Sequence, residues 1–148
     1  MARRPPPTAV LVASPDEIEA QFYEALQHGN LEQLMAVWAD DDDIVCVHPG
    51  GARLVGTAAI RAGFESLFSN GGLRVSPERV HRLHTVSSAV HHLAERITAE
   101  TPQGVQTGWI WATNVYIKTA QGWRLVAHHA SPANADDIGD DGQAAFLH

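Results

Sequence analysis

The sequence contains a single cysteine, Cys46, among its 148 residues. One cysteine cannot form a disulfide within the chain or build a zinc site from several thiolates. No apolar run approaches the roughly 20 residues that span a bilayer, and the apolar stretch 9–13 is too short for a secretory signal. The sequence therefore predicts a cytoplasmic protein, with residues 1–13 as a disordered arm before one folded domain.

Basic residues are also few, ten against seventeen acidic ones, for a net charge of −7. This balance argues against a nucleic acid or an anionic membrane as partner, because nothing offsets their phosphates. Eight of the acids form two groups, at 40–43 and within 136–141. The other nine nearly balance the ten basic residues, so the charge belongs to one turn and to an acidic tail, 133–148.

Recognisable cofactor motifs are missing. There is no dinucleotide fingerprint, phosphate loop or Gly-x-Ser-x-Gly element, and the run 40–43 lacks the glycine and glutamate of a calcium loop, which favours a solvated turn. Nine histidines are present. His81 and His84, like His91 and His92, are spaced to point to opposite faces of a strand, so neither pair predicts a chelate. We expect no metal and no cofactor.

Helical signals fill the first half of the chain. Ser14 starts a capping box with proline at the first helical position, and Gly29 ends that helix after His28. Asn30 is suited to cap a second helix, and Thr57 to cap a third that ends near 70. The expected buried positions recur at helical spacing: Ile18, Phe22, Ala25 and Leu26; Leu31, Leu34, Met35 and Trp38; Ile60, Phe64, Leu67 and Phe68.

Strand signals dominate the second half. Short strands are expected at 44–48 and 53–55, and four longer ones at 73–86, 89–100, 105–119 and 122–131. The short connections between the long strands require antiparallel neighbours. The sequence therefore predicts an α+β domain over residues 14–132, in which about three helices cover one face of a curved antiparallel sheet ending in a four-strand meander.

Four stretches carry a family resemblance: 29–40, beginning Gly-Asn-Leu-Glu; Val47-His48-Pro49; 54–60, which contains Gly-Thr; and 122–131, beginning Gly-Trp-Arg-Leu. Together they resemble the nuclear transport factor 2-like superfamily, also called SnoaL-like or ketosteroid-isomerase-like. The resemblance implies a cystatin-like cone around an apolar pocket, commonly in a homodimer joined through the sheet. The superfamily includes isomerases, dehydratases and cyclases, and also the association domain of calcium/calmodulin-dependent kinase.

The resemblance also suggests site positions. The isomerases carry an Asp-Pro base at the end of the first strand; the matching pair here is His48-Pro49 if the acidic run contains an insertion, and otherwise the base position falls on Cys46. Both side chains are expected on one face. The position of the isomerase tyrosine falls on Phe22, with Tyr23 beside it. His48 is our candidate general base, because an imidazole exchanges protons near neutral pH without a large pKa shift.

On the last strand, alternation separates His128 from His129. A three-residue loop at 120–122 would align Thr113 with His129 and Trp111 with Ser131, and we expect that mostly apolar face to line the pocket, with His129 orienting the substrate. The opposite face would then form the dimer interface: Asn114, Tyr116, Arg124, Val126 and His128. With a two-residue loop, Asn114 and Tyr116 would instead join His129. Glu95 alternates with Leu93 and Ile97, a pattern that fits a buried acid, but we favour an exposed edge position.

Two functional hypotheses follow. The first is a domain that binds a small apolar or amphipathic molecule and catalyses its isomerisation, dehydration or cyclisation, with His48 and His129 as catalytic residues. Its expected ligand contacts are Tyr23, Trp38, Cys46, Trp111, Thr113 and Ser131. The second is a non-catalytic association or ligand-sensing module like the kinase association domain. Fold alone cannot choose between these hypotheses, since one fold carries many functions.

Overall fold

The computed structural model describes residues 14–138; the predicted arm 1–13 lies outside the described residues. Helix α2 (Pro15–His28) begins and ends where the sequence predicts. The Ser14 side chain accepts a hydrogen bond from the backbone N–H of Glu17, which satisfies a donor of the first turn. Gly29 closes the helix at φ 63°, a left-handed conformation that favours glycine.

A second helix, α3 (Leu31–Val37), follows at once, and the Asn30 side chain caps it through the N–H of Gln33. Two short strands come next, β1 (Val45–Val47) and β2 (Arg53–Val55), and then helix α4 (Thr57–Leu67) and the 3₁₀ turn η1 (Phe68–Asn70). The acidic run forms the predicted exposed turn before β1. Its Asp40 accepts a hydrogen bond from the Thr57 hydroxyl at the start of α4.

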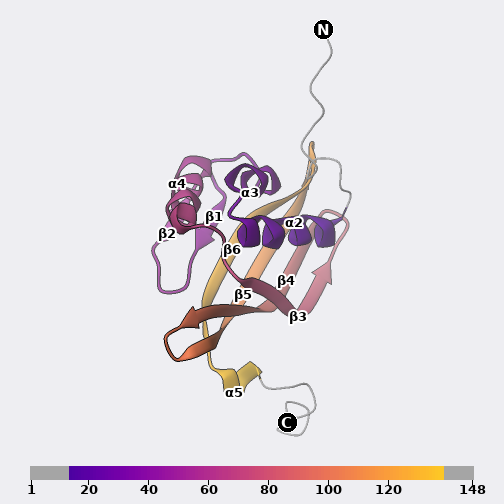
Figure 1. Ribbon diagram of the computed structural model, residues 1–148. Helices are drawn as coiled ribbons and strands as arrows, with labels where there is room; N and C mark the ends of the chain where they lie inside the picture. The colour runs from indigo at the N-terminus through magenta and orange to yellow at the C-terminus, as the bar shows by residue number, and fades with distance from the viewer. Residues whose placement is uncertain (1–13, 139–148) are drawn as a thin grey trace, which may run out of the picture.

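Four long strands complete the sheet: β3 (Val75–His84), β4 (Ser88–Thr101), β5 (Gly104–Thr119) and β6 (Gly122–Ala133). The order is β2-β1-β6-β5-β4-β3, antiparallel throughout except that β1 runs parallel to β6. Figure 1 shows α2, α3 and α4 on one face of this curved sheet. The α+β cone predicted from the sequence is confirmed.

The start of the predicted acidic tail differs from expectation. Strand β6 continues to Ala133, and a short helix, α5 (Ala135–Ile138), follows it. Ile138 is 2% exposed, so this apolar side chain holds the segment against the domain. Within residues 14–138, no helix is both long and apolar enough to cross a membrane.

A β-bulge in β6 decides which residues face the helices. The turn before β6 has two residues, with Thr119 paired to Gly122, rather than the three predicted. Val126 is then an extra residue, because Val115 pairs with Ala127 while Tyr116 pairs with Leu125. The bulge restores the predicted pairing of Thr113 with His129. Beyond the bulge, however, it reverses which side chains of β6 face the helices and which face away.

A second bulge lies in β3. Glu78 pairs with Ala94 and His81 with His92, so three steps along β3 match two along β4. Arg79, inside this bulge, has φ 56°, a conformation that non-glycine residues rarely adopt. The reversed alternation turns Arg82 and His84 toward the helices.

The core lies between α2 and the inner face of the sheet. The apolar side chains of α2 are buried as predicted and pack with buried residues of α3, α4 and the strands. Six buried polar or charged residues share this interior or its edge: Glu19, His91, Glu95, Asn114, Arg124 and His128. Because a buried polar group needs hydrogen-bond partners, the candidate functional groups of the interior are found among these six residues and their partners.

Candidate functional site

A cavity of about 330 Å³ opens at one end of the cone, next to α2 and α4. Its wall is mostly apolar and includes three titratable side chains, those of His48, Glu95 and His128. The remaining lining residues are Phe22, Leu26, Pro49, Phe64, Leu67, Leu73, Val75, Ile97 and Ile110. An apolar enclosure with a few convergent polar groups is typical of a small-molecule site.

A second cavity, of about 500 Å³, lies near the acidic turn and is lined by Trp38, Asp40, Asp41 and Arg124 among others. The predicted placement of Trp38 in the wall of the cone cavity is therefore wrong. Trp38 precedes β1 and pairs as an isolated bridge with Leu125, which turns it toward the far end of β6. The residues that line this cavity include no histidine and no buried carboxyl, so we place the candidate site in the cone cavity.

Glu95 is the one acid among the residues that line the cavity. It projects from β4 on the same face as Leu93 and Ile97 and is 5% exposed, so the expected exposed edge position is wrong. Burial raises the pKa of its carboxyl to about 7, and the charge of Glu19 acts in the same direction. The hydroxyl of Tyr23 donates to Glu95 Oε2 at 2.7 Å and opposes that rise in pKa. Glu95 can therefore exchange a proton near neutral pH.

His128, not His129, faces the cavity. Its Nδ1 lies 2.5 Å from Asn114 Oδ1, and the Asn114 amide nitrogen donates to Tyr23 and Glu19. The Asn114 carbonyl oxygen must therefore accept a hydrogen bond from His128 Nδ1–H. His128 Nε2 then carries no proton and presents its lone pair, 3.9 Å from Glu95 Oε2. Burial lowers the pKa of His128 to about 3, so this imidazole is neutral under ordinary conditions.

His48 follows β1 and lines the same cavity, where its ring meets the edge of Phe64 with centroids 5.0 Å apart. Burial lowers its pKa below the usual value of 6.5, which keeps the imidazole neutral near pH 7. The structure thus places the predicted base in the cavity wall; its catalytic role stays a prediction.

Two other residues expected to contact the ligand, Cys46 and Tyr23, are buried and are not among the residues that line the cavity. Cys46 is fully buried, 3.9 Å from His48 Nε2, and burial raises the pKa of its thiol to about 12. Tyr23 is buried as well, and burial followed by the nearby Glu95 charge raises its pKa well above 10. Tyr23 therefore remains a hydrogen-bond donor to Glu95, while Phe22 beside it lines the cavity.

The other predicted site residues lie on the outer face of the sheet. His129 and Ser131 are exposed, and Trp111 and Thr113 are half-buried on the side away from the helices. The Trp111 ring stacks on exposed His92, with centroids 5.2 Å apart. Placing these four residues in the pocket was wrong. The Val126 bulge reverses the alternation of β6 and turns His129 and Ser131 outward, and Thr113 and Trp111 pair with them and so lie on the same outer face.

The expected dimer interface was wrong for the same reason. Asn114, Tyr116 and His128 point into the domain, where each residue is at most 4% exposed. Sequence reasoning missed His128 because the bulge leaves no signal in the composition of β6. The sequence did carry a signal for Glu95, since the alternation of Leu93, Glu95 and Ile97 places the carboxyl on the apolar face of β4.

A curved sheet wrapped around α2, with a cavity at its open end, defines a SnoaL-like cone. The family model of the SnoaL-like domain matches residues 16–135, and the chain belongs to this family. No curated protein matches its sequence.

Solved structures give more detailed likenesses. The chain is 38% identical, with a TM-score of 0.75, to a Thiobacillus denitrificans protein called a calcium/calmodulin-dependent protein kinase type II association domain; the match covers 82% of this chain and 97% of that one. It is 28% identical, with a TM-score of 0.72, to a Streptomyces avermitilis protein of the NTF2-like family called a dehydratase, over 81% and 94% of the two chains. A kinase hub from S. rosetta, 20% identical with a TM-score of 0.64 over 89% and 100%, shares the fold.

Proposed function

We propose that this protein binds a small, largely apolar molecule in the cone cavity and transfers protons within it, as in an isomerisation or a dehydration. The observation that carries the proposal is a buried carboxyl, Glu95, whose pKa of about 7 suits proton exchange at neutral pH, in an apolar cavity shared with His48 and His128. His128 takes the orienting role that the sequence predicted for His129.

In this mechanism, neutral His48 accepts a proton from a carbon of the substrate while protonated Glu95 donates one to a nearby oxygen. If that oxygen is a hydroxyl, it leaves as water and a carbon–carbon double bond forms. If it is a carbonyl oxygen of an unsaturated ketone, a conjugated enol forms. His48 then returns its proton to another carbon of the conjugated system while the enol hydroxyl returns its proton to Glu95, which gives an isomer and restores both groups. After dehydration, proton transfer from His48 to Glu95, directly or through water, restores them. Nε2 of His128 is available to accept a hydrogen bond from a substrate hydroxyl.

The mechanism requires His48 neutral and Glu95 protonated at the same time. The pKa of His48 lies below 6.5 and that of Glu95 is about 7, so activity should be highest between these values. It should fall at lower pH as His48 gains a proton, and at higher pH as Glu95 loses one.

Exchange of α-protons offers a test that does not depend on the natural substrate. We expect the protein to accelerate deuterium exchange at the α-carbon of small cyclic ketones in D₂O, followed by proton NMR, and His48→Gln and Glu95→Gln to lose at least the roughly 100-fold that one acid or base contributes. His129→Gln, on the outer face, is the matched control and should retain full activity. Equal rates for His48→Gln and the unaltered protein would remove His48 from the mechanism.

Binding can be tested separately from chemistry. Cyclohexanone observed by saturation-transfer NMR should bind the unaltered protein and Ile117→Trp, whose side chain lies 40% exposed on the outer face. Ile97→Trp, which fills the cavity wall, should abolish the signal. Binding that survives Ile97→Trp would show that the ligand does not use this cavity.

An association function is the second candidate, favoured by the 38% identity to the Thiobacillus denitrificans protein. We propose a homodimer joined through the outer face of the sheet, where half-buried Trp111 and exposed Ile117 offer apolar area. Sedimentation should then show a dimer that Trp111→Arg weakens. A ring of more than two subunits, together with no cavity binding, would favour an association module over an enzyme.

A further inference from the structure

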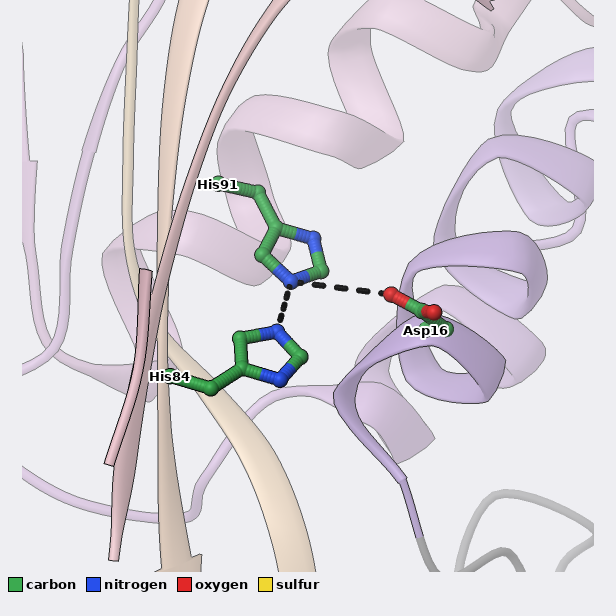
Figure 2. A group of neighbouring side chains, drawn as sticks. All are labelled: Asp16, His84 and His91. Carbon is green, nitrogen blue, oxygen red and sulfur yellow. Dashed lines mark hydrogen bonds and ion pairs between the residues drawn. The ribbon is translucent and has the colours of Figure 1, made fainter. Parts of the chain in front are cut away.

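Three potential metal ligands meet where the start of α2 approaches β3 and β4 (Figure 2). Asp16 comes from the first turn of α2, and His84 and His91 come from the neighbouring strands β3 and β4. Their ligating atoms all lie within 4.8 Å of one another. Within residues 14–138, this is the one cluster of three such groups. The mechanism proposed above uses none of them.

The two histidines meet across the strands rather than along one. The pairing of His84 with Ala89 and of Arg82 with His91 makes His84 and His91 diagonal neighbours on the inner face. Nε2 of His84 lies 2.8 Å from Nε2 of His91, and their rings stack with centroids 5.0 Å apart. The sequence prediction treated the spacings 81/84 and 91/92 separately and could not see this pair, which depends on the β3 bulge.

A buried carboxylate fixes the orientation of His91. Nδ1 of this fully buried ring lies 2.8 Å from Glu19 Oε2, to which its N–H donates a hydrogen bond. The other ring nitrogen, Nε2, then presents its lone pair toward His84 and toward Asp16, whose Oδ1 lies 3.6 Å away. A carboxylate behind an imidazole is the arrangement that holds histidine ligands in metal sites.

We propose that Asp16, His84 and His91 bind a divalent zinc ion, with Glu19 as the outer-shell partner of His91. Two imidazoles and one carboxylate leave a fourth position for water, as in three-ligand zinc sites. Ligand atoms in a tetrahedral zinc site lie about 3.3 Å apart, given bonds of roughly 2.0–2.1 Å. Two of the three separations, 2.8 and 3.6 Å, lie on either side of that value, and the third, between His84 and Asp16, is within 4.8 Å. Movement of these two exposed side chains can therefore complete the geometry.

Arg82 competes with the ion for Asp16. Its Nε donates to Asp16 Oδ1 at 2.8 Å, and both side chains are about half exposed, 45% and 52%. Such exposed pairs are weak, with a median contribution of about 0–1 kcal/mol. Zinc can therefore displace the guanidinium, and removal of Arg82 should tighten zinc binding, which loss of a merely structural ion pair would not do.

The test is a zinc titration of the untagged chain by calorimetry, with thermal unfolding as a second readout. We expect one equivalent of zinc to bind and to raise Tm, because a ligand that binds only the folded state stabilises it. His84→Ala should lower the affinity more than the roughly 10–100-fold that loss of an outer-shell partner costs. Arg82→Gln should raise it. His91→Gln removes the buried ligand, and His84→Ala tests the same site at an exposed position should His91→Gln fail to fold.

His81→Ala is the matched control, since His81 is also an exposed histidine of β3 but pairs with His92 on the outer face. It should bind zinc as the unaltered protein does. The proposal is overturned if no zinc binds, if His84→Ala binds as tightly as the unaltered chain, or if His81→Ala loses binding instead.

Discussion

Two buried glutamates in the same interior have different surroundings. Glu19 Oε2 lies 2.7 Å from the Tyr116 hydroxyl, 2.8 Å from His91 Nδ1 and 3.4 Å from the Asn114 amide, and receives a hydrogen bond from each. Glu95 receives one hydrogen bond from the described side chains, that of the Tyr23 hydroxyl, and its carboxyl borders the cavity. Both residues are 5% exposed, so burial alone does not separate them.

The difference shows that the number of hydrogen-bond donors around a buried carboxyl decides whether it serves as a structural anchor or as a proton donor. Glu19 joins α2 to β4 and β5 through its donors, which makes it a structural anchor. Glu95 lacks enough donors to offset its desolvation, and its pKa rises to about 7. Glu19 and Glu95 are linked through Asn114 and Tyr23, so the anchor also positions the acid.

The largest effect should come from removing the anchor. Glu19→Ala leaves three buried donors unsatisfied, each costing about 1–3 kcal/mol, so we expect a loss of roughly 4 kcal/mol in the free energy of unfolding. Urea denaturation followed by circular dichroism measures it. A loss below about 1 kcal/mol would mean that water replaces the carboxylate without penalty.

Glu95→Gln should change the pH dependence of stability. A folded pKa of about 7, above the ordinary 4.5, stabilises the protein fully below pH 4.5, and this contribution is lost as pH rises through 7. Glutamine has no such loss. The stability of Glu95→Gln relative to the unaltered protein should therefore grow by about 3 kcal/mol between roughly pH 4 and pH 8. The same difference at both pH values would contradict the raised pKa.

Tyr23→Phe should raise the pKa of Glu95 further and so increase its difference from Glu19, with a smaller effect on stability. It removes the hydrogen bond that lowers the pKa of Glu95, so the alkaline limb of the activity profile should move to higher pH. The net loss of stability should be about 2 kcal/mol, because the Tyr23 hydroxyl also accepts a hydrogen bond from Asn114 and each lost hydrogen bond costs roughly 1 kcal/mol. An unchanged profile would show that Tyr23 does not act on Glu95.

The smallest effect is expected on the outer face. His92→Ala removes an exposed ring stacked on Trp111, and we expect less than about 0.5 kcal/mol of stability and no change in cavity binding. Chemical denaturation and ketone binding check both. A large loss in either would show that the outer face takes part in the site.

Much of the fold could be predicted from local patterns. The capping residues Ser14, Asn30 and Gly29 begin and end helices where their chemistry indicates, because these signals act within a few residues. The hairpins follow from short connections, and the pairing of Thr113 with His129 was also correct. Such features depend on sequence neighbours that a reader of the chain can see.

The bulges could not be predicted. Neither Arg79 nor Val126 is a glycine, and each extra residue is required by the curvature of the whole sheet rather than by its neighbours. One bulge turns His128 rather than His129 to the cavity, and the other turns His84 toward His91. A single-residue shift thus moved histidines between faces in both strands.

The central claim is that Glu95 exchanges its proton near neutral pH. The most direct measurement is a carbon-13 NMR titration of glutamate side-chain carboxyls, with Glu95→Gln used to assign the resonance. We predict a midpoint near pH 7 for Glu95, as its burial requires. A midpoint at or below the ordinary 4.5 would contradict the raised pKa and, with it, the acid role assigned to Glu95.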